Sequence, residues 1–196
     1  MSFSLQDFNF YFGLGWEHII SADALDHQIF ILALAAVYSF RELKQVLIFV
    51  TAFTIGHSAT LVLSVLDIVR FPSNIVEFLI PCTIVVTALN NLYRINAVGA
   101  NAKWNYYLAV GFGLVHGMGF ANAIRMMLAK DQNIGWGLFS FNLGVEIGQL
   151  VLVVIVLLAA MGLVDFLNVK RRDWVLFISS GVFALSMQMV IERWPY

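Results

Sequence analysis

Residues 17–30 read EHIISADALDHQIF, and an apolar run follows them as far as Val37. Two of the four histidines, His18 and His27, lie in this stretch beside several carboxylates. Carboxylates and imidazoles at the mouth of a membrane helix are costly to bury without partners. The stretch therefore predicts a cation-binding or proton-relay site at the entrance of a membrane segment.

Composition places the whole chain among the helical membrane proteins. Of its 196 residues 61% are hydrophobic and only 12% are charged, whereas a soluble domain carries about 25% charged residues. The apolar stretches approach or exceed the ~20 residues that cross ~30 Å of hydrocarbon. The sequence predicts an all-α integral membrane protein, one polytopic domain of residues 1–196 with a bundle of six transmembrane helices. Their approximate spans are 24–40, 45–69, 75–95, 104–128, 135–163 and 174–191.

The ends of these segments predict how the chain sits in a bilayer. Residues 3–12 are aromatic but too short to cross, so they predict a short interfacial segment at the N-terminus. The loops after the first, third and fifth segments hold seven Lys and Arg residues, and the opposite side holds four. The positive-inside rule then places both termini outside a bacterial-type inner (plasma) membrane.

Charge and cysteine content exclude several functions. The net charge of −1 offers no basic surface, so nucleic acid is not an expected partner. Cys82 is the only cysteine, which excludes an intrachain disulfide and a thiolate metal cage. The expected partners are the lipid bilayer and a divalent metal ion, and a homo-oligomer or an accessory subunit stays open.

Further polar residues lie inside the predicted spans. His57 and His116 are central in the second and fourth segments, and Glu146 is central in the fifth. A carboxylate deep in an apolar helix is expected to face a polar interior rather than lipid. Four polar residues on the faces of His57 and Glu146 are expected to support such a site: Asn142, Gln149, Thr54 and Ser58.

Pairs of small residues predict where the helices approach one another. Gly113 and Gly117 flank His116 with small-x-x-x-small spacing, and Gly144 and Gly148 repeat this spacing in the fifth segment. We expect close helix packing at both pairs.

Taken together, these residues predict an outward-facing funnel. Asp26 and His27 would form a vestibule, and His57, His116 and Glu146 would form a cluster near the midplane. Imidazole and carboxylate without thiolate suit Ni(II), Co(II) or Zn(II). His57 or His116 alone is explained slightly better as an interhelical hydrogen-bonding residue, but the group favours a metal or proton site.

Asp23 has two interpretations in this scheme. It is either the N-cap of the first span, a position that Ser21 also suits, or a further metal ligand.

Four motifs together resemble the HupE/UreJ family. They are GWEHI (15–19) with DH (26–27), FTIGHSATL (53–61), FGLVHGMGFA (112–121) and FNLGVEIGQ (141–149). That family is described as membrane proteins of six to eight helices associated with hydrogenase and urease accessory genes, and its members are regarded as nickel or cobalt permeases. The resemblance implies metal handling, with these residues in the motif positions: His18, Asp26, His27, His57, His116 and Glu146.

One departure from the family pattern concerns His18. The usual first-helix pattern is His, five residues and Asp-His, whereas seven residues separate His18 from Asp26 here. On one continuous helix His18 and His27 would be ~13 Å apart along the axis and could not share an ion. A break at residues 21–23 would fold His18 back over the entrance.

Three functions follow as hypotheses. The first is a permease for nickel, cobalt or zinc, which would be passive or driven by an ion gradient because the sequence has no nucleotide-binding motif. The second is an intramembrane zinc hydrolase, in which three imidazoles, or two and a carboxylate, would leave one coordination position open. The third is a metal sensor or storage protein without transport.

Overall fold

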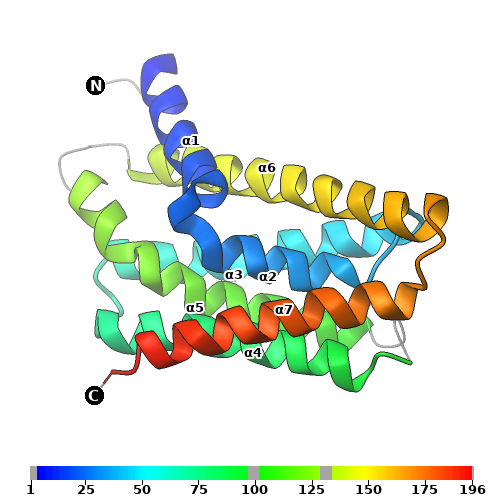
Figure 1. Ribbon diagram of the computed structural model, residues 1–196. Coiled ribbons are helices and arrows are strands. Elements are labelled where there is room, and N and C mark those ends of the chain that lie inside the picture. Colours follow the sequence, from blue (N-terminus) through cyan, green and yellow to red (C-terminus); the bar gives the residue numbers. More distant parts are fainter. Residues whose placement is uncertain (1–3, 97–101, 129–133, 196) are drawn as a thin grey trace.

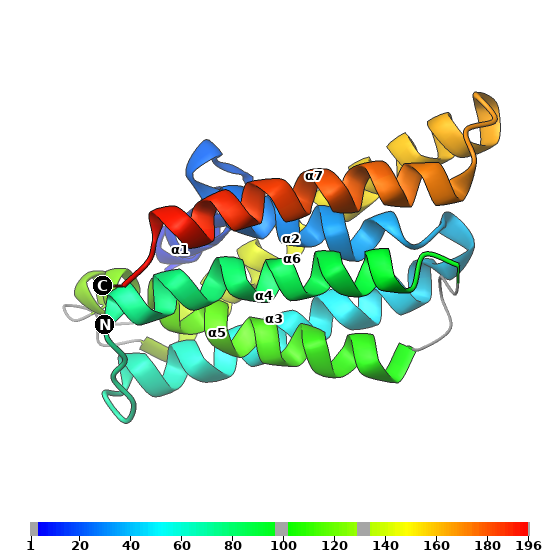
Figure 2. The same ribbon diagram turned by 60° about the horizontal axis from the view of Figure 1, so that its bottom comes forward.

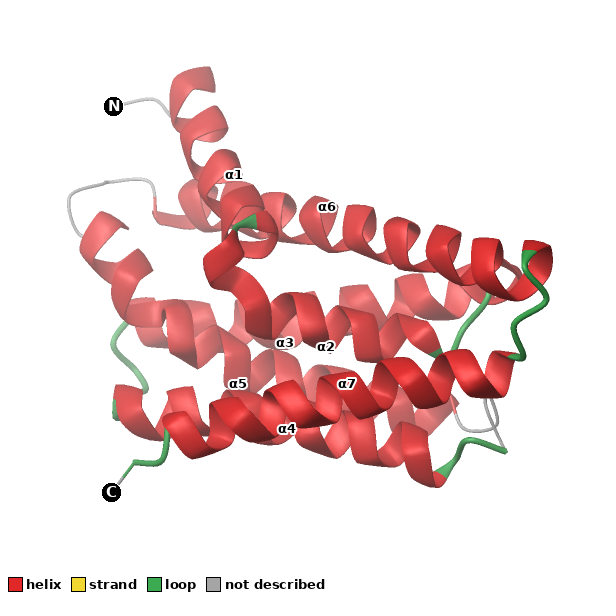
Figure 3. Cartoon of the chain, in the orientation of Figure 1, coloured by secondary structure: helices red, strands yellow, loops and turns green. Residues whose placement is uncertain are grey.

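The computed structural model describes residues 4–96, 102–128 and 134–195, and this part of the chain is helical without a strand (Figure 3). Its α-helices are α1 (Leu5–Ile20), α2 (Leu25–Ala36), α3 (Leu43–Val65), α4 (Ser73–Tyr93), α5 (Ala102–Leu128), α6 (Ile134–Met161) and α7 (Arg171–Glu192). Short helical turns at Ala22–Ala24, Phe40–Glu42 and Gly162–Phe166 connect some of them. The all-helical class that the sequence predicts is confirmed for the described residues.

Helices α2 to α7 run along one another in a bundle, and α1 leans away from it (Figures 1 and 2). Both chain ends lie at the same end of this bundle, on the left in Figure 1. We call this the terminus end and the opposite one the far end. The connections α2–α3 and α6–α7 lie at the far end.

Apolar length supports the membrane assignment. Among the described residues, four helices are long and apolar enough to cross a membrane: Phe40–Val65, Ser73–Tyr93, Ile134–Phe166 and Arg171–Glu192. The pair α1 and α2 would be a fifth span, bent by 57° at its break. The count of six spans stays a prediction.

The first predicted span differs from the observed helices. Helix α2 has 12 residues, or about 18 Å, which is too short to cross by itself. It ends at Ala36, before the predicted Phe40, because Ser39 and Glu42 form a capping box that begins the next helical segment. The aromatic residues at the N-terminus continue as α1 to Ile20, well beyond residue 12.

The break between α1 and α2 is stabilised by one side chain. Ser21 has extended backbone angles, and a single 3₁₀ turn follows it. Gln28 Nε2 donates to the carbonyl oxygens of Ile19 (3.2 Å), Ile20 (3.2 Å) and Ser21 (2.7 Å). The carbonyls of Ile19 and Ile20 lie at the end of α1, where a helix leaves carbonyls without intrahelical partners, whereas the Ser21 carbonyl also accepts from the N–H of Ala24. Gln28 therefore replaces the hydrogen bonds that the break removes.

Helix α3 ends at Val65, earlier than the predicted residue 69. Asp67 has a left-handed backbone with a φ of 62°, and its N–H bonds to the Ser64 carbonyl oxygen. A left-handed residue just past the last turn is a common way to end a helix.

Glycines set two close helix pairs, as the small-x-x-x-small spacing predicts. A Cβ atom at Gly113 of α5 would overlap the Phe53 carbonyl oxygen of α3, and a Cβ at Gly144 of α6 would overlap the Phe12 carbonyl oxygen of α1. These contacts bring α3 against α5 and α1 against α6, so the helices that carry His57 and His116 lie backbone to backbone.

Candidate metal centre

Four helices bring the four histidines to one place. His18 lies in the last turn of α1, His27 in the first turn of α2, His57 in α3 and His116 in α5. The ring centroids are 4.7 Å apart for His18 and His27, 4.8 Å for His27 and His116, and 6.0 Å for His18 and His57. The break at Ser21 is what places His18 beside His27. We call these four residues the histidine cluster.

Three members of the cluster have the geometry of a metal site. One ring nitrogen each from His18, His27 and His57 lies within 4.8 Å of the others. Tetrahedral ligands at ~2.1 Å from an ion are ~3.4 Å apart. Small rotations of the imidazoles would therefore close this triad around one ion.

Several ring nitrogens of the histidine cluster have no hydrogen-bond partner among the described residues. Among the described residues, Nε2 of His18, His27 and His116 and both ring nitrogens of His57 are buried and unpaired. His57 and His116 are 0% and 1% exposed. Buried polar atoms are normally hydrogen-bonded, and each neutral imidazole offers one lone-pair nitrogen, so these rings could supply one donor each to a metal cation, as the triad of His18, His27 and His57 does in its geometry.

The opposite nitrogens of two rings are held in place. His27 Nδ1 lies 3.0 Å from Asp26 Oδ1, and His116 Nδ1 lies 2.8 Å from the Phe112 carbonyl oxygen. Metal-binding histidines characteristically donate their second N–H to a carboxylate or a backbone carbonyl, which fixes the tautomer. Asp26, expected as a ligand, is thus placed as the hydrogen-bond partner of His27.

An acidic vestibule leads from the terminus end to the cluster. It is an open cavity of about 580 Å³, with His18, His27 and His116 among its lining residues. Its carboxylates are Glu17, Asp23, Asp26 and Glu77, and its cation is Arg193. Arg193 Nη1 lies 3.4 Å from Asp26 Oδ2.

Asp23 lies outside the triad of His18, His27 and His57. It is exposed on the 3₁₀ turn and lines the vestibule. Neither Asp23 nor Ser21 is the N-cap of α2, because Ala24 occupies that position. Ser21 is instead the N-cap residue of the 3₁₀ turn, where its side chain makes no capping hydrogen bond.

Glu146 does not lie in the histidine cluster. Its Oε1 accepts a hydrogen bond from Thr51 Oγ1 (2.9 Å), and Gln149 Oε1 accepts one from Thr54 Oγ1 (2.9 Å). Glu146 and Ser58 line an open groove of about 570 Å³ between α3 and α6.

Asn142 differs from Glu146 in its surroundings. Its side chain faces the ring of His57, and its Nδ2 donates to the Leu138 carbonyl oxygen (2.9 Å). Its Oδ1 is buried without a partner among the described residues. The polar stripe of α6 therefore divides, with Asn142 at the cluster and Glu146 at the groove.

Sequence reasoning missed two contributors, Gln28 and Arg193. Gln28 follows the Asp-His motif directly, but only the break gives it carbonyls to bind. Arg193 counts in the sequence as a loop charge near the end of the chain. Its contact with Asp26, 167 positions earlier, depends on α7 lying beside α2, for which the sequence carries no signal.

Apolar helices, a buried histidine cluster and an acidic vestibule together define a helical membrane protein with the donor groups of a transition-metal site. A family model described as HupE / UreJ protein matches residues 2–193, and the chain belongs to this family. The resemblance seen in the four motifs is thereby confirmed. Comparisons with curated proteins and with solved structures gave no match.

Proposed function

We propose that the protein binds a divalent transition-metal ion in the histidine cluster and carries it across the membrane. The observation that supports this most is the set of buried, unpaired ring nitrogens of His18, His27, His57 and His116. Family membership supports a role connected with nickel or cobalt. Neutral imidazole donors suit Ni(II) and Co(II), with Zn(II) as a further candidate.

Capture begins in the vestibule. Among the described lining residues, four carboxylates against one guanidinium give this cavity an excess of negative charge, which raises the local concentration of cations. The ion then exchanges water for imidazole nitrogen as it reaches His18 and His27, the two cluster members at the bend.

The orientation of the protein forms part of the proposal. Both termini would lie outside a bacterial-type inner membrane, because the far-end loops carry most of the Lys and Arg residues. The vestibule at the terminus end would then take ions from outside. Six spans, with the bent α1–α2 pair as the first and α5 among the others, would complete the bundle.

Metal analysis of the purified protein tests the binding step. The wild-type protein incubated with Ni²⁺, Co²⁺ or Zn²⁺ and then desalted is expected to retain one ion per chain. His57→Ala and His116→Ala are expected to lose it. Retention of the ion by both variants, or no ion in the wild type, would contradict the proposed site.

Flux into vesicles tests the transport step. The wild-type protein reconstituted in liposomes is expected to admit the ion that it binds, whereas His57→Ala is expected to admit none above empty liposomes. Stoichiometric binding without flux would instead indicate a sensor or storage protein.

A further inference from the structure

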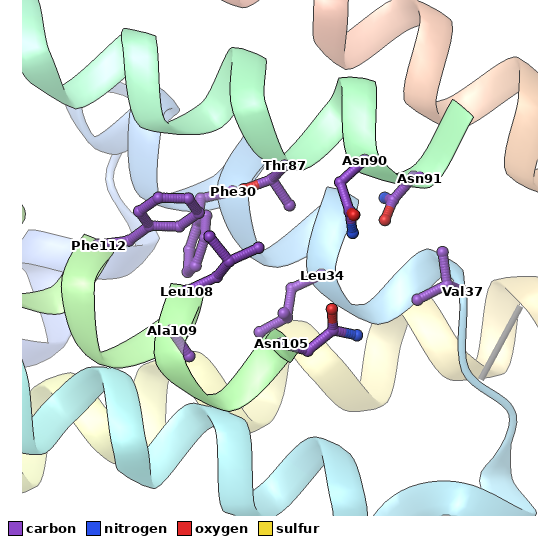
Figure 4. A pocket seen from close by; sticks show the side chains of 10 residues that line it. All are labelled: Phe30, Leu34, Val37, Thr87, Asn90, Asn91, Asn105, Leu108, Ala109 and Phe112. Atoms are coloured by element: carbon purple, nitrogen blue, oxygen red, sulfur yellow. The ribbon is translucent and has the colours of Figure 1, made fainter. Parts of the chain in front are cut away.

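A second, smaller pocket lies on the other side of Phe30 and Phe112 from the histidine cluster. It has a volume of about 10 Å³, room for about one water molecule. Its walls come from α2, α4 and α5 (Figure 4). They are Phe30, Leu34, Val37, Thr87, Asn90, Asn91, Asn105, Leu108, Ala109 and Phe112.

Three carboxamides gather at the end of this pocket remote from the phenylalanines (Figure 4). Asn91 Nδ2 donates to the Ala33 carbonyl oxygen (2.8 Å), and Asn105 Nδ2 donates to Tyr38 Oη (2.5 Å). These bonds use the amide nitrogens, and an amide oxygen can accept hydrogen bonds or bind a cation. With Asn90 the two residues contribute a set of neutral oxygens inside an otherwise apolar bundle. Asn91 lies in the last turn of α4 and Asn105 in the first turn of α5, so the amides lie near the far end of the bundle. Polar groups that face the interior of a membrane bundle commonly mark the pathway of an ion.

Aromatic side chains separate this pocket from the histidine cluster. Phe30 of α2 contacts Phe53 of α3 and Phe112 of α5, with centroids 5.1 and 5.5 Å apart. Phe30 and Phe53 also contact the ring of His116, at 5.8 and 5.2 Å. All three phenylalanines are buried. We call them the phenylalanine barrier.

Phe112 connects the barrier to the cluster directly. Its carbonyl oxygen accepts the hydrogen bond of His116 Nδ1, and its ring lines the small pocket. A shift of this part of α5 would therefore move a cluster histidine and the barrier together.

The two cavities differ in a way that fits one state of a transporter. The vestibule of about 580 Å³ is open to the terminus end, whereas the amide pocket holds about 10 Å³. Transporters commonly alternate between states in which opposite sides of a central site are open. If the protein transports, this structure fits a form that is open toward the termini and closed at the phenylalanine barrier.

We propose that the amide pocket is the far-side half of the ion path, where Asn90, Asn91 and Asn105 hold a partly hydrated divalent cation after it passes Phe30, Phe53 and Phe112. This inference rests on the proposed transport function. Neutral amide oxygens bind such an ion more weakly than imidazoles, which favours its release from the far end.

Cysteine accessibility tests the path without using metal. In a Cys82→Ala background, Asn90→Cys in the pocket and Ser21→Cys in the vestibule are treated with a charged, membrane-impermeant thiol reagent. The reagent is added to one face of oriented vesicles at a time. We expect Asn90→Cys to react from the far face only and Ser21→Cys from the terminus face only. Reaction of Asn90→Cys from the terminus face, or from neither face, would overturn the proposal.

Metal retention and flux, measured together, test the pocket's role. The double variant Asn90→Leu, Asn105→Leu is expected to retain one ion per chain, which also reports a folded protein, and to lose flux at least tenfold. Asn74→Leu, an exposed position of the same helix α4, is the control and should match the wild type. Wild-type flux in the double variant, or loss of its bound ion, would overturn the pocket's role.

The experiments distinguish failure of the proposed transport function from failure of the proposed amide pocket. Absence of flux in the wild type contradicts transport, whereas a wild-type protein that transports while Asn90→Cys is closed to the far face contradicts only the pocket.

Discussion

Asp26 Oδ1 lies 3.0 Å from Nδ1 of His27, the next residue along the chain. Nε2 of the same ring has no hydrogen-bond partner among the described residues, and the ring lies beside those of His18 and His116. A carboxylate in this position fixes the tautomer of a metal ligand and makes the ligand more basic.

Removing the charge of Asp26 is therefore expected to weaken metal binding. Asp26→Asn should lower the affinity by about 10- to 100-fold, the range seen when such a partner is changed. Calorimetric titration of the purified protein with Ni²⁺ measures this. Asp23→Asn removes the same charge from the exposed part of the vestibule and should have a much smaller effect. Equal losses in the two variants would mean that only the vestibule charge matters.

Arg193 is expected to oppose ion capture. It is the cation among the described residues that line the vestibule, and it contacts Asp26. Arg193→Gln should raise the rate of ion binding by about tenfold at low ionic strength, and salt should reduce the difference. Stopped-flow mixing with Co²⁺ measures the rate. Arg172→Gln removes the same charge from an exposed site at the far end and should bind at the wild-type rate. If both variants bind at one rate, the contact with Asp26 has no role in capture.

The close packing of α3 and α5 makes Gly113 sensitive to any side chain. Gly113→Ala would put a methyl group against the Phe53 carbonyl oxygen, and overpacking of this kind costs about 1–3 kcal/mol. We expect a lower thermal stability in detergent and weaker metal binding, because the two helices carry His57 and His116. Gly111→Ala on the same helix meets no atom within 4 Å and should match the wild type. A Gly113→Ala protein as stable as Gly111→Ala would contradict the packing.

A variant of Glu146 distinguishes the metal site expected from the sequence, which includes this carboxylate, from the histidine cluster of the structure, which does not. Because Glu146 bonds to Thr51 in the groove and lies outside the histidine cluster, Glu146→Gln should retain one metal ion per chain. Elemental analysis beside His57→Ala measures this. Loss of the ion in Glu146→Gln would instead indicate that the Glu146 carboxylate is a metal ligand.

The sequence predicts the fold class and the ingredients of the site well, for physical reasons. Apolar length and the low share of charge are sufficient for a helical membrane protein, and histidines inside such segments are costly enough to be informative. The position of His18 is harder to predict from the sequence, because it depends on the break in the helix after Ile20. The sequence offers only Ser21 and Asp23 as a signal for that break.

The sequence alone does not predict which face of a helix is turned toward the site. Asn142 and Glu146 are one turn apart and share a stripe, but a step of four residues rotates the side chain by about 40°. This rotation, together with the glycine contact that sets α6 against α1, separates a residue beside His57 from one in the groove. Helix rotation is decided by packing between distant segments, which no local pattern records.

The elbow that Gln28 stabilises has a mechanical consequence. His18 lies before the elbow and His27 after it, so the angle between α1 and α2 determines the separation of the two imidazoles. Straightening toward one continuous helix would draw the two rings apart and dismantle the site. Under the proposed metal binding, Gln28 would influence how tightly the ion is held without being a ligand, because its amide contacts with the carbonyls of residues 19–21 oppose this straightening.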